Sequence, residues 1–279
     1  MKLIEIIKAI ILGIVEGITE WLPVSSTGHL ILFDEFLSLN VSEEFRALFL
    51  VVIQLGAILA VPVLFFDKLN PFGKKKTAEE KRGTWNLWGK VVVGMLPAAL
   101  IGIPLDDLFE AHLYRYEVVA AALIVYGVAF IVIENRRRAS SFRIEDVHEL
   151  TYRDALVIGA FQVLSLIPGT SRSGSTILGG MLTGVSRTAS AEFSFFMAIP
   201  VMLGASLLKI LKFFLDGFTA TAPELGLLLI GCAVSFVVSL LAIRFLMDFV
   251  KRHDFKPFGI YRIGLGVLVL GYFLIRSFV

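Results

Sequence analysis

The hydrophobic residues of this chain lie in long runs that charged residues seldom interrupt. A transmembrane helix needs about 20 mostly apolar residues. Six uncharged cores reach that length, alone or once flanking residues that suit the membrane interface are added. These cores are Leu48–Phe66, Val91–Leu105, Val118–Ile133, Phe193–Leu208, Leu225–Ile243 and Ile263–Ile275. The pattern therefore predicts six membrane crossings.

Two further apolar regions are broken in the middle and carry charged residues within the apolar stretch. They span residues 3–37 and 155–185, with breaks at 23–28 and 168–174. A cleaved signal peptide is the alternative for the first region, because Lys2 and Lys8 are basic. Glu16 and Glu20 argue against it, since two carboxylates do not fit the apolar segment of such a peptide. We expect each region to form a broken, re-entrant helix pair.

The two halves of the chain are similar to each other, which predicts an internal repeat. At an offset of 146, Gly13, Glu16, Ser25, Thr27 and Gly28 align with Gly159, Gln162, Ser171, Ser173 and Gly174. At an offset of 148, Ser42, Glu44 and Phe45 align with Ser190, Glu192 and Phe193. Each half has one broken pair and three crossings, and an odd number of crossings gives the halves opposite topology. Many transporters with discontinuous helices share this plan.

The predicted fold class is all-α: a polytopic integral membrane protein with two inverted repeats, six transmembrane helices and two broken or re-entrant helix pairs. We expect one membrane domain, 1–279. Repeat one covers about 1–135 and repeat two about 153–279, and a charged inside loop, 136–152, joins them.

Composition supports a membrane protein and excludes other classes. Hydrophobic residues make up 57% of the chain and charged residues 18%, whereas soluble domains average about 45–50% and about 25%. The mean hydropathy is +0.82. Cys232 is the single cysteine, which excludes a disulfide scaffold. The net charge of +2 gives no reason to expect a nucleic-acid partner.

Basic residues predict the side of the membrane that each loop faces. With the N-terminus outside, the segments 68–90, 136–153 and 244–256 lie inside and hold 16 of the 26 Lys and Arg, and the outside receives seven. The positive-inside rule therefore favours both termini outside. Broken pairs that crossed the membrane fully would give the same sidedness, so charge does not choose between the two arrangements.

The broken regions also carry the candidate chemistry. Glu16 and Glu20 lie one turn apart on a glycine-containing helix face, and burying a charge in a membrane costs at least about 2.5 kcal/mol. A pair of interfacial acids is the alternative, but two such acids also suit a hard divalent cation. Each break supplies hydroxyls and a helix N-terminus, which favour anions, and Arg172 adds a guanidinium suited to phosphate oxygens. Packing serines and glycines would explain the small residues but not Arg172.

Two further residues have open interpretations. His29 lies near Ser25 and Ser26 in sequence, and a Ser–His pair could generate a nucleophile, although a lone histidine is as often a core residue. Arg262 either adds a second cation to the site or extends to the membrane interface.

These residues resemble the bacterial undecaprenyl-diphosphate phosphatase family, the bacitracin-resistance type. One motif runs from Glu16 through Glu20 to His29 and includes Pro-Val-Ser-Ser-Thr-Gly-His. The other is Pro-Gly-x-Ser-Arg-Ser-x-x-Thr at 168–176. The segment Ile260–Arg262 also resembles the family, and hydropathy, repeat and length agree from end to end.

The resemblance implies dephosphorylation of the lipid undecaprenyl diphosphate to the monophosphate carrier for cell-wall and envelope polysaccharide synthesis. It also implies a divalent cation (Mg²⁺ or Ca²⁺), the bacterial plasma membrane, and a site open to the extracytoplasmic face. By position it assigns catalysis to Glu20, Ser26, His29 and Arg172, and metal binding to Glu16 and Glu20. Substrate phosphate binding falls to Ser25, Thr27, Gly169, Ser171, Ser173, Thr176 and Arg262.

Three alternatives stay open at this point. Ser26 is the favoured nucleophile with His29 as its base or acid, but a metal-activated water is the other mechanism. A secondary transporter or flippase of an anionic lipid is the rival function, because inverted repeats with broken helices are common among transporters. Whether the protein forms a homodimer is also open.

Overall fold

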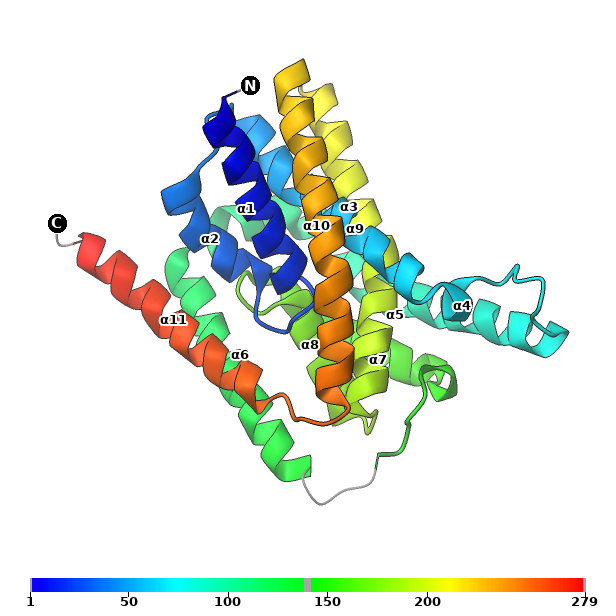
Figure 1. Ribbon diagram of the computed structural model, residues 1–279. Helices are drawn as coiled ribbons and strands as arrows, with labels where there is room; N and C mark the ends of the chain where they lie inside the picture. Colours follow the sequence, from blue (N-terminus) through cyan, green and yellow to red (C-terminus); the bar gives the residue numbers. More distant parts are fainter. Residues whose placement is uncertain (1, 138–141, 278–279) are drawn as a thin grey trace.

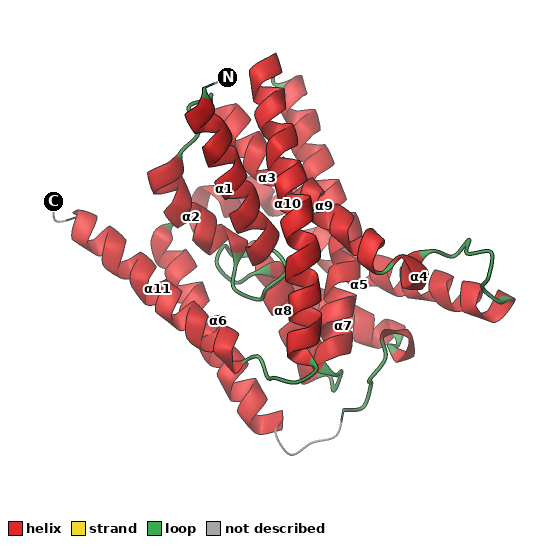
Figure 2. Cartoon of the chain, in the orientation of Figure 1, coloured by secondary structure: helices red, strands yellow, loops and turns green. Residues whose placement is uncertain are grey.

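The computed structural model describes residues 2–137 and 142–277, which form a bundle of helices (Figures 1 and 2). Within these residues six helices are long and apolar enough to cross a membrane: α3 (Glu43–Leu64), α5 (Ala78–Leu113), α6 (Tyr116–Arg137), α9 (Arg187–Leu215), α10 (Ala222–Val250) and α11 (Lys256–Ser277). The shorter elements are α1 (Leu3–Thr19), α2 (Ser26–Leu37), α4 (Phe66–Leu69), η1 (Val147–Glu149), α7 (Tyr152–Val163), η2 (Leu164–Leu166) and α8 (Arg172–Leu182). The prediction of an all-α polytopic membrane protein is confirmed.

The first broken region is a hairpin whose two ends lie together. Lys8 Nζ, near the start of α1, donates to the carbonyl of Ser38 just after α2 (2.7 Å). The backbone N–H of Asn40 donates to Glu5 on α1 (2.8 Å). The chain therefore returns to the side from which it came, as a re-entrant pair does.

The second broken region closes in the same way at the other end of the bundle. Arg143 pairs with Asp154 in the first turn of α7 and donates to the carbonyl of Thr183 directly after α8. Burial by itself would raise the pKa of Asp154, but hydrogen bonds from Thr151 and Arg143 outweigh it and hold that pKa below its ordinary value. In Figure 1 the α1–α2 hairpin occupies the upper half and α7–α8 the lower half, so their tips meet near the middle.

The helix contacts of the two halves of the chain are similar. α1 packs along α10 and α7 packs along α5, while the equivalent helices α6 and α11 pack against each other. Each break ends in the same cap: Ser25 and Ser171 both have a left-handed backbone (φ 73° and 70°), and each side chain accepts from the backbone N–H three residues on. The opposite membrane topology of the halves and the repeat boundaries stay predictions.

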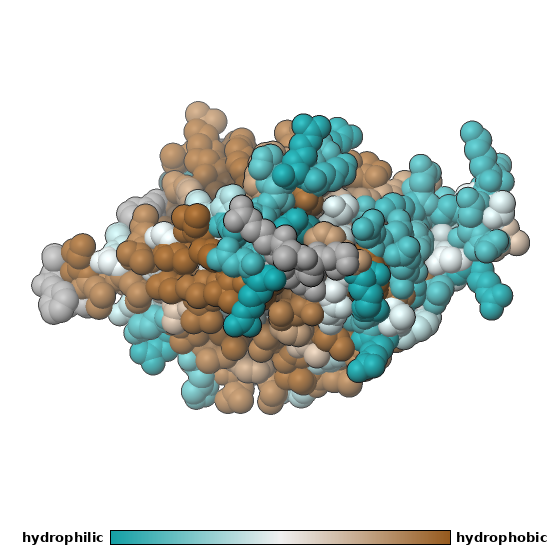
Figure 3. All heavy atoms as spheres, turned by 90° about the horizontal axis from the view of Figure 1, so that it is seen from below, coloured by the Kyte–Doolittle hydropathy of each residue, from teal (hydrophilic) through white to brown (hydrophobic). Residues whose placement is uncertain are grey.

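The surface matches a protein surrounded by lipid. Seen from below (Figure 3), hydrophobic residues cover much of the rim, while hydrophilic residues gather over the middle and at the right-hand end. That end corresponds to α4 and the start of α5, which project from the bundle in Figure 1. Apolar side chains on the rim can face lipid, because they require no hydrogen bonds to water.

Glycines allow the closest helix contacts, and one of them gives a stability prediction. A Cβ added to Gly159 on α7 would lie 2.0 Å from the carbonyl oxygen of Gly94 on α5. Gly159→Ala should therefore destabilise the protein by about 1–3 kcal/mol, the usual cost of overpacking, measured as thermal unfolding in detergent. Gly264→Ala on α11, where an added Cβ meets nothing within 4 Å, is the matched control. Equal melting temperatures for the two variants would contradict the prediction.

Candidate active site

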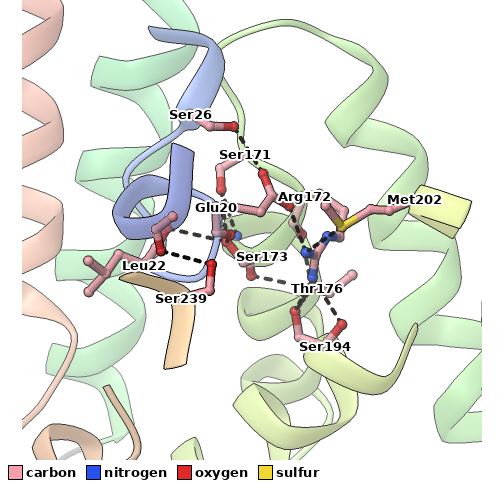
Figure 4. Close-up of polar contacts among 12 residues, drawn as sticks. Glu20, Leu22, Ser26, Ser171, Arg172, Ser173, Thr176, Ser194, Met202 and Ser239 are labelled. Carbon is pink, nitrogen blue, oxygen red and sulfur yellow. Dashed lines mark hydrogen bonds and ion pairs between the residues drawn. The ribbon is translucent and has the colours of Figure 1, made fainter. Parts of the chain in front are cut away.

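The tips of the two hairpins bring three charged or hydroxyl side chains together (Figure 4). Glu20 follows α1, Ser26 begins α2 and Arg172 begins α8. Ser26 Oγ donates to Glu20 Oε2 (3.0 Å), and Arg172 Nη2 donates to Glu20 Oε1 (2.7 Å). The Glu20 carboxylate thus joins a hydroxyl from one half of the chain to a guanidinium from the other.

Arg172 is held by several neighbours besides Glu20. Its Nη1 donates to the carbonyl and hydroxyl of Ser194 on α9 (3.0 and 3.2 Å), and its guanidinium lies 5.6 Å from the ring centre of buried Trp21. The Arg172 side chain is only 11% exposed. These contacts fix the plane of the guanidinium. A fixed guanidinium is better suited than a mobile cationic side chain to bind the oxygens of a tetrahedral phosphate.

The small polar residues of the two breaks mainly hold the tips in place. The hydroxyls of Ser25 and Ser171 cap α2 and α8 through Gly28 and Gly174. Ser173 Oγ lies within hydrogen-bond distance of the carbonyls of Glu20 (3.1 Å) and Leu22 (3.3 Å), so it links the two halves. The remaining predicted phosphate ligands are Thr176, which bonds Ser194 Oγ at 2.7 Å, half-buried Thr27, and Gly169 with φ +95°.

The hydroxyls therefore shape the site, and the phosphate contacts predicted for them stay predictions. The first N–H groups of an α-helix lack partners within the helix and favour anions. Since α2 and α8 both begin at the tips beside Arg172, two helix N-termini add to its positive charge.

His29 is buried and lies three residues after Ser26 in the sequence, but its ring contacts other groups. Nδ1 lies 2.7 Å from the carbonyl of Ser25, and Nε2 lies 2.7 Å from the hydroxyl of Tyr261, whose ring stacks on the imidazole. A carbonyl only accepts, so Nδ1 carries a proton, and in the neutral ring Nε2 accepts from Tyr261. The contacts favour Glu20 over His29 as the proton acceptor for Ser26, and the Ser26–His29 pair stays a prediction.

Arg262 lies in the protein interior instead of at the membrane interface. Its exposed fraction is 0%, which rules out the interfacial alternative. Nη1 donates to the carbonyl of Pro23 (3.1 Å), and Nη2 donates to the carbonyls of Gly169 (2.8 Å) and Thr170 (2.9 Å). Arg262 thus contacts both breaks, and a direct contact with phosphate stays a prediction.

Glu16 is the residue that most suits a metal ion. It is fully buried one turn before Glu20, and neither of its carboxylate oxygens has a hydrogen-bond partner among the described residues. A buried carboxylate without a partner is costly unless a cation or a proton neutralises it. Among the side chains that the structure describes, no three or more His, Cys, Asp or Glu are placed together for a metal. Hydroxyls, carbonyls, water or substrate would have to complete the coordination of a hard cation, which often keeps such ligands.

Sequence reasoning missed three residues at the tips. Ser194 binds Arg172, Trp21 lies beside the same guanidinium, and Tyr261 binds His29. Ser194 and Trp21 had no motif signal, because their contacts come from packing. Tyr261 had a weak one, since it directly precedes Arg262 in a segment already singled out.

Comparison with known proteins agrees with the motifs of the two tips. A family model described as "Bacitracin resistance protein BacA" matches residues 9–268, which include every side chain discussed at the site. The chain belongs to the BacA family. Its relatives within the BacA family match almost end to end, so they cover both hairpins.

Three of these BacA-family relatives are each named undecaprenyl-diphosphatase. The protein from Enterococcus faecalis is 57% identical over 267 residues, covering 96% of this chain and 97% of its own. The protein from Lactiplantibacillus plantarum is 57% identical, covering 97% of this chain and 98% of its own. The protein from Desulfitobacterium hafniense is 56% identical over 280 residues, the whole of both chains.

Proposed function

We propose that this BacA-family chain is an undecaprenyl-diphosphate phosphatase that releases the terminal phosphate and leaves undecaprenyl phosphate. The observation that carries the proposal is the triad at the hairpin tips, in which Glu20 joins the Ser26 hydroxyl to Arg172. A hydroxyl paired with a carboxylate is suited to nucleophilic attack, and a fixed guanidinium is suited to diphosphate. A lipid transporter requires neither a nucleophile nor its base.

The proposed reaction begins at Ser26 Oγ. This oxygen attacks the terminal phosphorus, the bond from that phosphorus to the bridging oxygen breaks, and undecaprenyl phosphate leaves with the bonding electrons. The hydroxyl proton goes to Glu20 Oε2, to which Ser26 already donates. Water then attacks the phosphoserine, Oγ takes the proton back from Glu20, and inorganic phosphate leaves.

Arg172 stabilises the charge that develops during the transfer. Phosphoryl transfer depends mainly on positioning and on stabilising charge spread over the phosphoryl oxygens. Arg172 is positioned before substrate binds, by Ser194 and by the ring of Trp21. Little reorganisation is then required when the transition state forms. The N-termini of α2 and α8 also stabilise negative charge on the phosphoryl oxygens.

Glu16 and Glu20 would hold the divalent cation that the family resemblance implies, Mg²⁺ or Ca²⁺. The support for this assignment is the buried Glu16 carboxylate without a partner. Bound there, the cation would neutralise the two acids and polarise phosphate oxygens.

The metal assignment predicts the outcome of chelation. Protein purified in detergent should release phosphate from undecaprenyl diphosphate with Mg²⁺ or Ca²⁺ present, and EDTA should reduce the rate at least about tenfold. Glu16→Gln should raise the metal concentration for half-maximal activity by about tenfold or more, because an amide oxygen lacks the charge. Exposed Glu44→Gln on α3 is the matched control. Full activity in EDTA argues against the metal, and no phosphate release from the wild type argues against the function.

We further infer that the protein lies in the bacterial plasma membrane with both termini outside and the site open to the extracytoplasmic face. The support is the distribution of basic residues, 16 of 26 in the three segments assigned to the inside. A cysteine-labelling reagent that cannot cross the membrane should label Asp216→Cys, between α9 and α10, in intact cells.

A further inference from the structure

A buried arginine on α11 contacts the breaks of both halves of the chain. The guanidinium of Arg262 binds the carbonyls of Pro23 in the first break and of Gly169 and Thr170 in the second. The helix that follows each break begins with a residue of the proposed site: Ser26 begins α2 and Arg172 begins α8. One rigid group therefore sets the distance between the backbones that present them.

The surroundings of Arg262 keep it in this position. Its guanidinium lies 5.4 Å from the ring centre of Tyr126 on α6, and the Tyr126 hydroxyl accepts from Ser175 on α8. Gly174 lets α8 approach, since a Cβ there would lie 3.1 Å from Arg262 Nη1. The guanidinium is thus enclosed by α6, α8 and the two breaks.

The chemistry of these contacts requires an arginine. A planar guanidinium presents its N–H donors in a fixed fork, so it can bind carbonyls in two directions at once. An isolated charge buried in a membrane protein is expensive, and backbone carbonyls are one of the partners that such residues use. Arg262 is fully buried and both of its terminal nitrogens have carbonyl partners, so its contacts point to the breaks and not to the substrate.

We propose that Arg262 is a positioning residue that holds the Ser26 break and the Arg172 break in register, so that nucleophile and phosphate clamp face each other. Catalysis is sensitive to such register, because a misplacement of about 1 Å can cost about 10²-fold in rate. The proposal rests on the phosphatase function, but the contacts that carry it do not include the substrate.

Steady-state kinetics separate positioning from phosphate binding. Arg262→Gln should lower kcat for phosphate release by about 10²-fold. Arg262→Lys should recover about tenfold of that loss, because it keeps the charge and up to three donors but not the fork. KM should stay within about twofold in both variants. A rise in KM with an unchanged kcat would overturn the proposal in favour of direct phosphate binding.

Hydrogen exchange tests the register without relying on catalysis. In Arg262→Gln, amides of the peptides covering 20–28 and 166–174 should lose protection together, while peptides from α3 and α10 keep theirs. Unchanged protection in both breaks would overturn the proposal even if activity fell. If the wild type released no phosphate, this measurement would still decide the role of Arg262.

Arg187, the first residue of α9, provides a matched control at another ion pair, with Glu134 on α6. It pairs with buried Glu134 through Nε (2.8 Å) and Nη2 (2.5 Å), and it has no contact with either break among the described residues. Arg187→Gln should lower the melting temperature, because it leaves Glu134 buried without its cation, and should leave kcat within about twofold. An equal fall of kcat in Arg187→Gln and Arg262→Gln would reduce the role of Arg262 to general stability and overturn the proposal.

Discussion

Replacing Arg172 by alanine should lower kcat for phosphate release by about 10³-fold or more. Arg172 is the one cation that contacts Glu20 directly in the described structure, and it begins α8 at the point where the two hairpins meet. The loss removes charge stabilisation from the transition state and leaves the Glu20 carboxylate without its ion pair. Both effects act on the reacting groups.

Arg172→Lys separates charge from geometry. Lysine restores the charge, but it cannot bind Ser194 and Glu20 at once through a planar fork, so about 10²-fold of the loss should remain. Phosphate release measured with and without divalent cation is the assay. Arg115→Ala, an exposed arginine in the loop before α6, is the control and should keep wild-type kcat. An Arg172→Ala variant with more than about a tenth of wild-type kcat would contradict the assignment of Arg172.

Ser26→Ala should abolish turnover by the proposed covalent route, with a loss of about 10³-fold or more in kcat. Glu20→Gln should lower kcat by about 10²–10⁴-fold, because the amide cannot take the Ser26 proton that Glu20 Oε2 is placed to accept. The two effects should not add in the double variant, since the residues act in one step.

Trapping of the intermediate distinguishes the two mechanisms. Rapid acid quenching of the wild type with labelled substrate should leave phosphate on Ser26, detected by mass spectrometry. Ser171→Ala provides a serine control at the position equivalent to Ser25, and it should lose stability through its cap but keep the trapped label. Turnover that persists in Ser26→Ala at a tenth of wild type or more would favour a metal-activated water.

The membrane spans were predictable from sequence because lipid imposes a simple requirement. A bilayer demands about 20 apolar residues per crossing and internal satisfaction of every backbone group. Five of the six cores lie wholly in long helices of the structure, and Leu48–Phe66 runs two residues past the end of α3 at Leu64. The breaks were predictable for a related reason: proline and a Ser/Gly-rich segment end one helix and cap the next, as Ser25 and Ser171 do.

The candidate site residues could also be singled out from the sequence, since charges inside apolar runs require a reason. Glu16, Glu20 and Arg172 stood out on that basis, and Glu20 and Arg172 do meet across the two halves. Their pairing was not predictable, because 152 residues separate them and no local periodicity records such a contact. The same holds for Ser26, whose hydroxyl contacts Glu20, while His29, three residues further on, contacts Tyr261.

Hydropathy and motifs were enough to predict a membrane environment, the helical spans, the positions of the two breaks and the candidate site residues. Local hydropathy and cap chemistry are enough for these features. Which of those residues meet could be read only from the folded structure. Arg262 is the clearest example: its sequence allowed a phosphate ligand or an interfacial residue, whereas its three carbonyl partners come from segments 92 to 239 residues away. Partners at such separations depend on how all the helices pack, and that is a property of the whole fold.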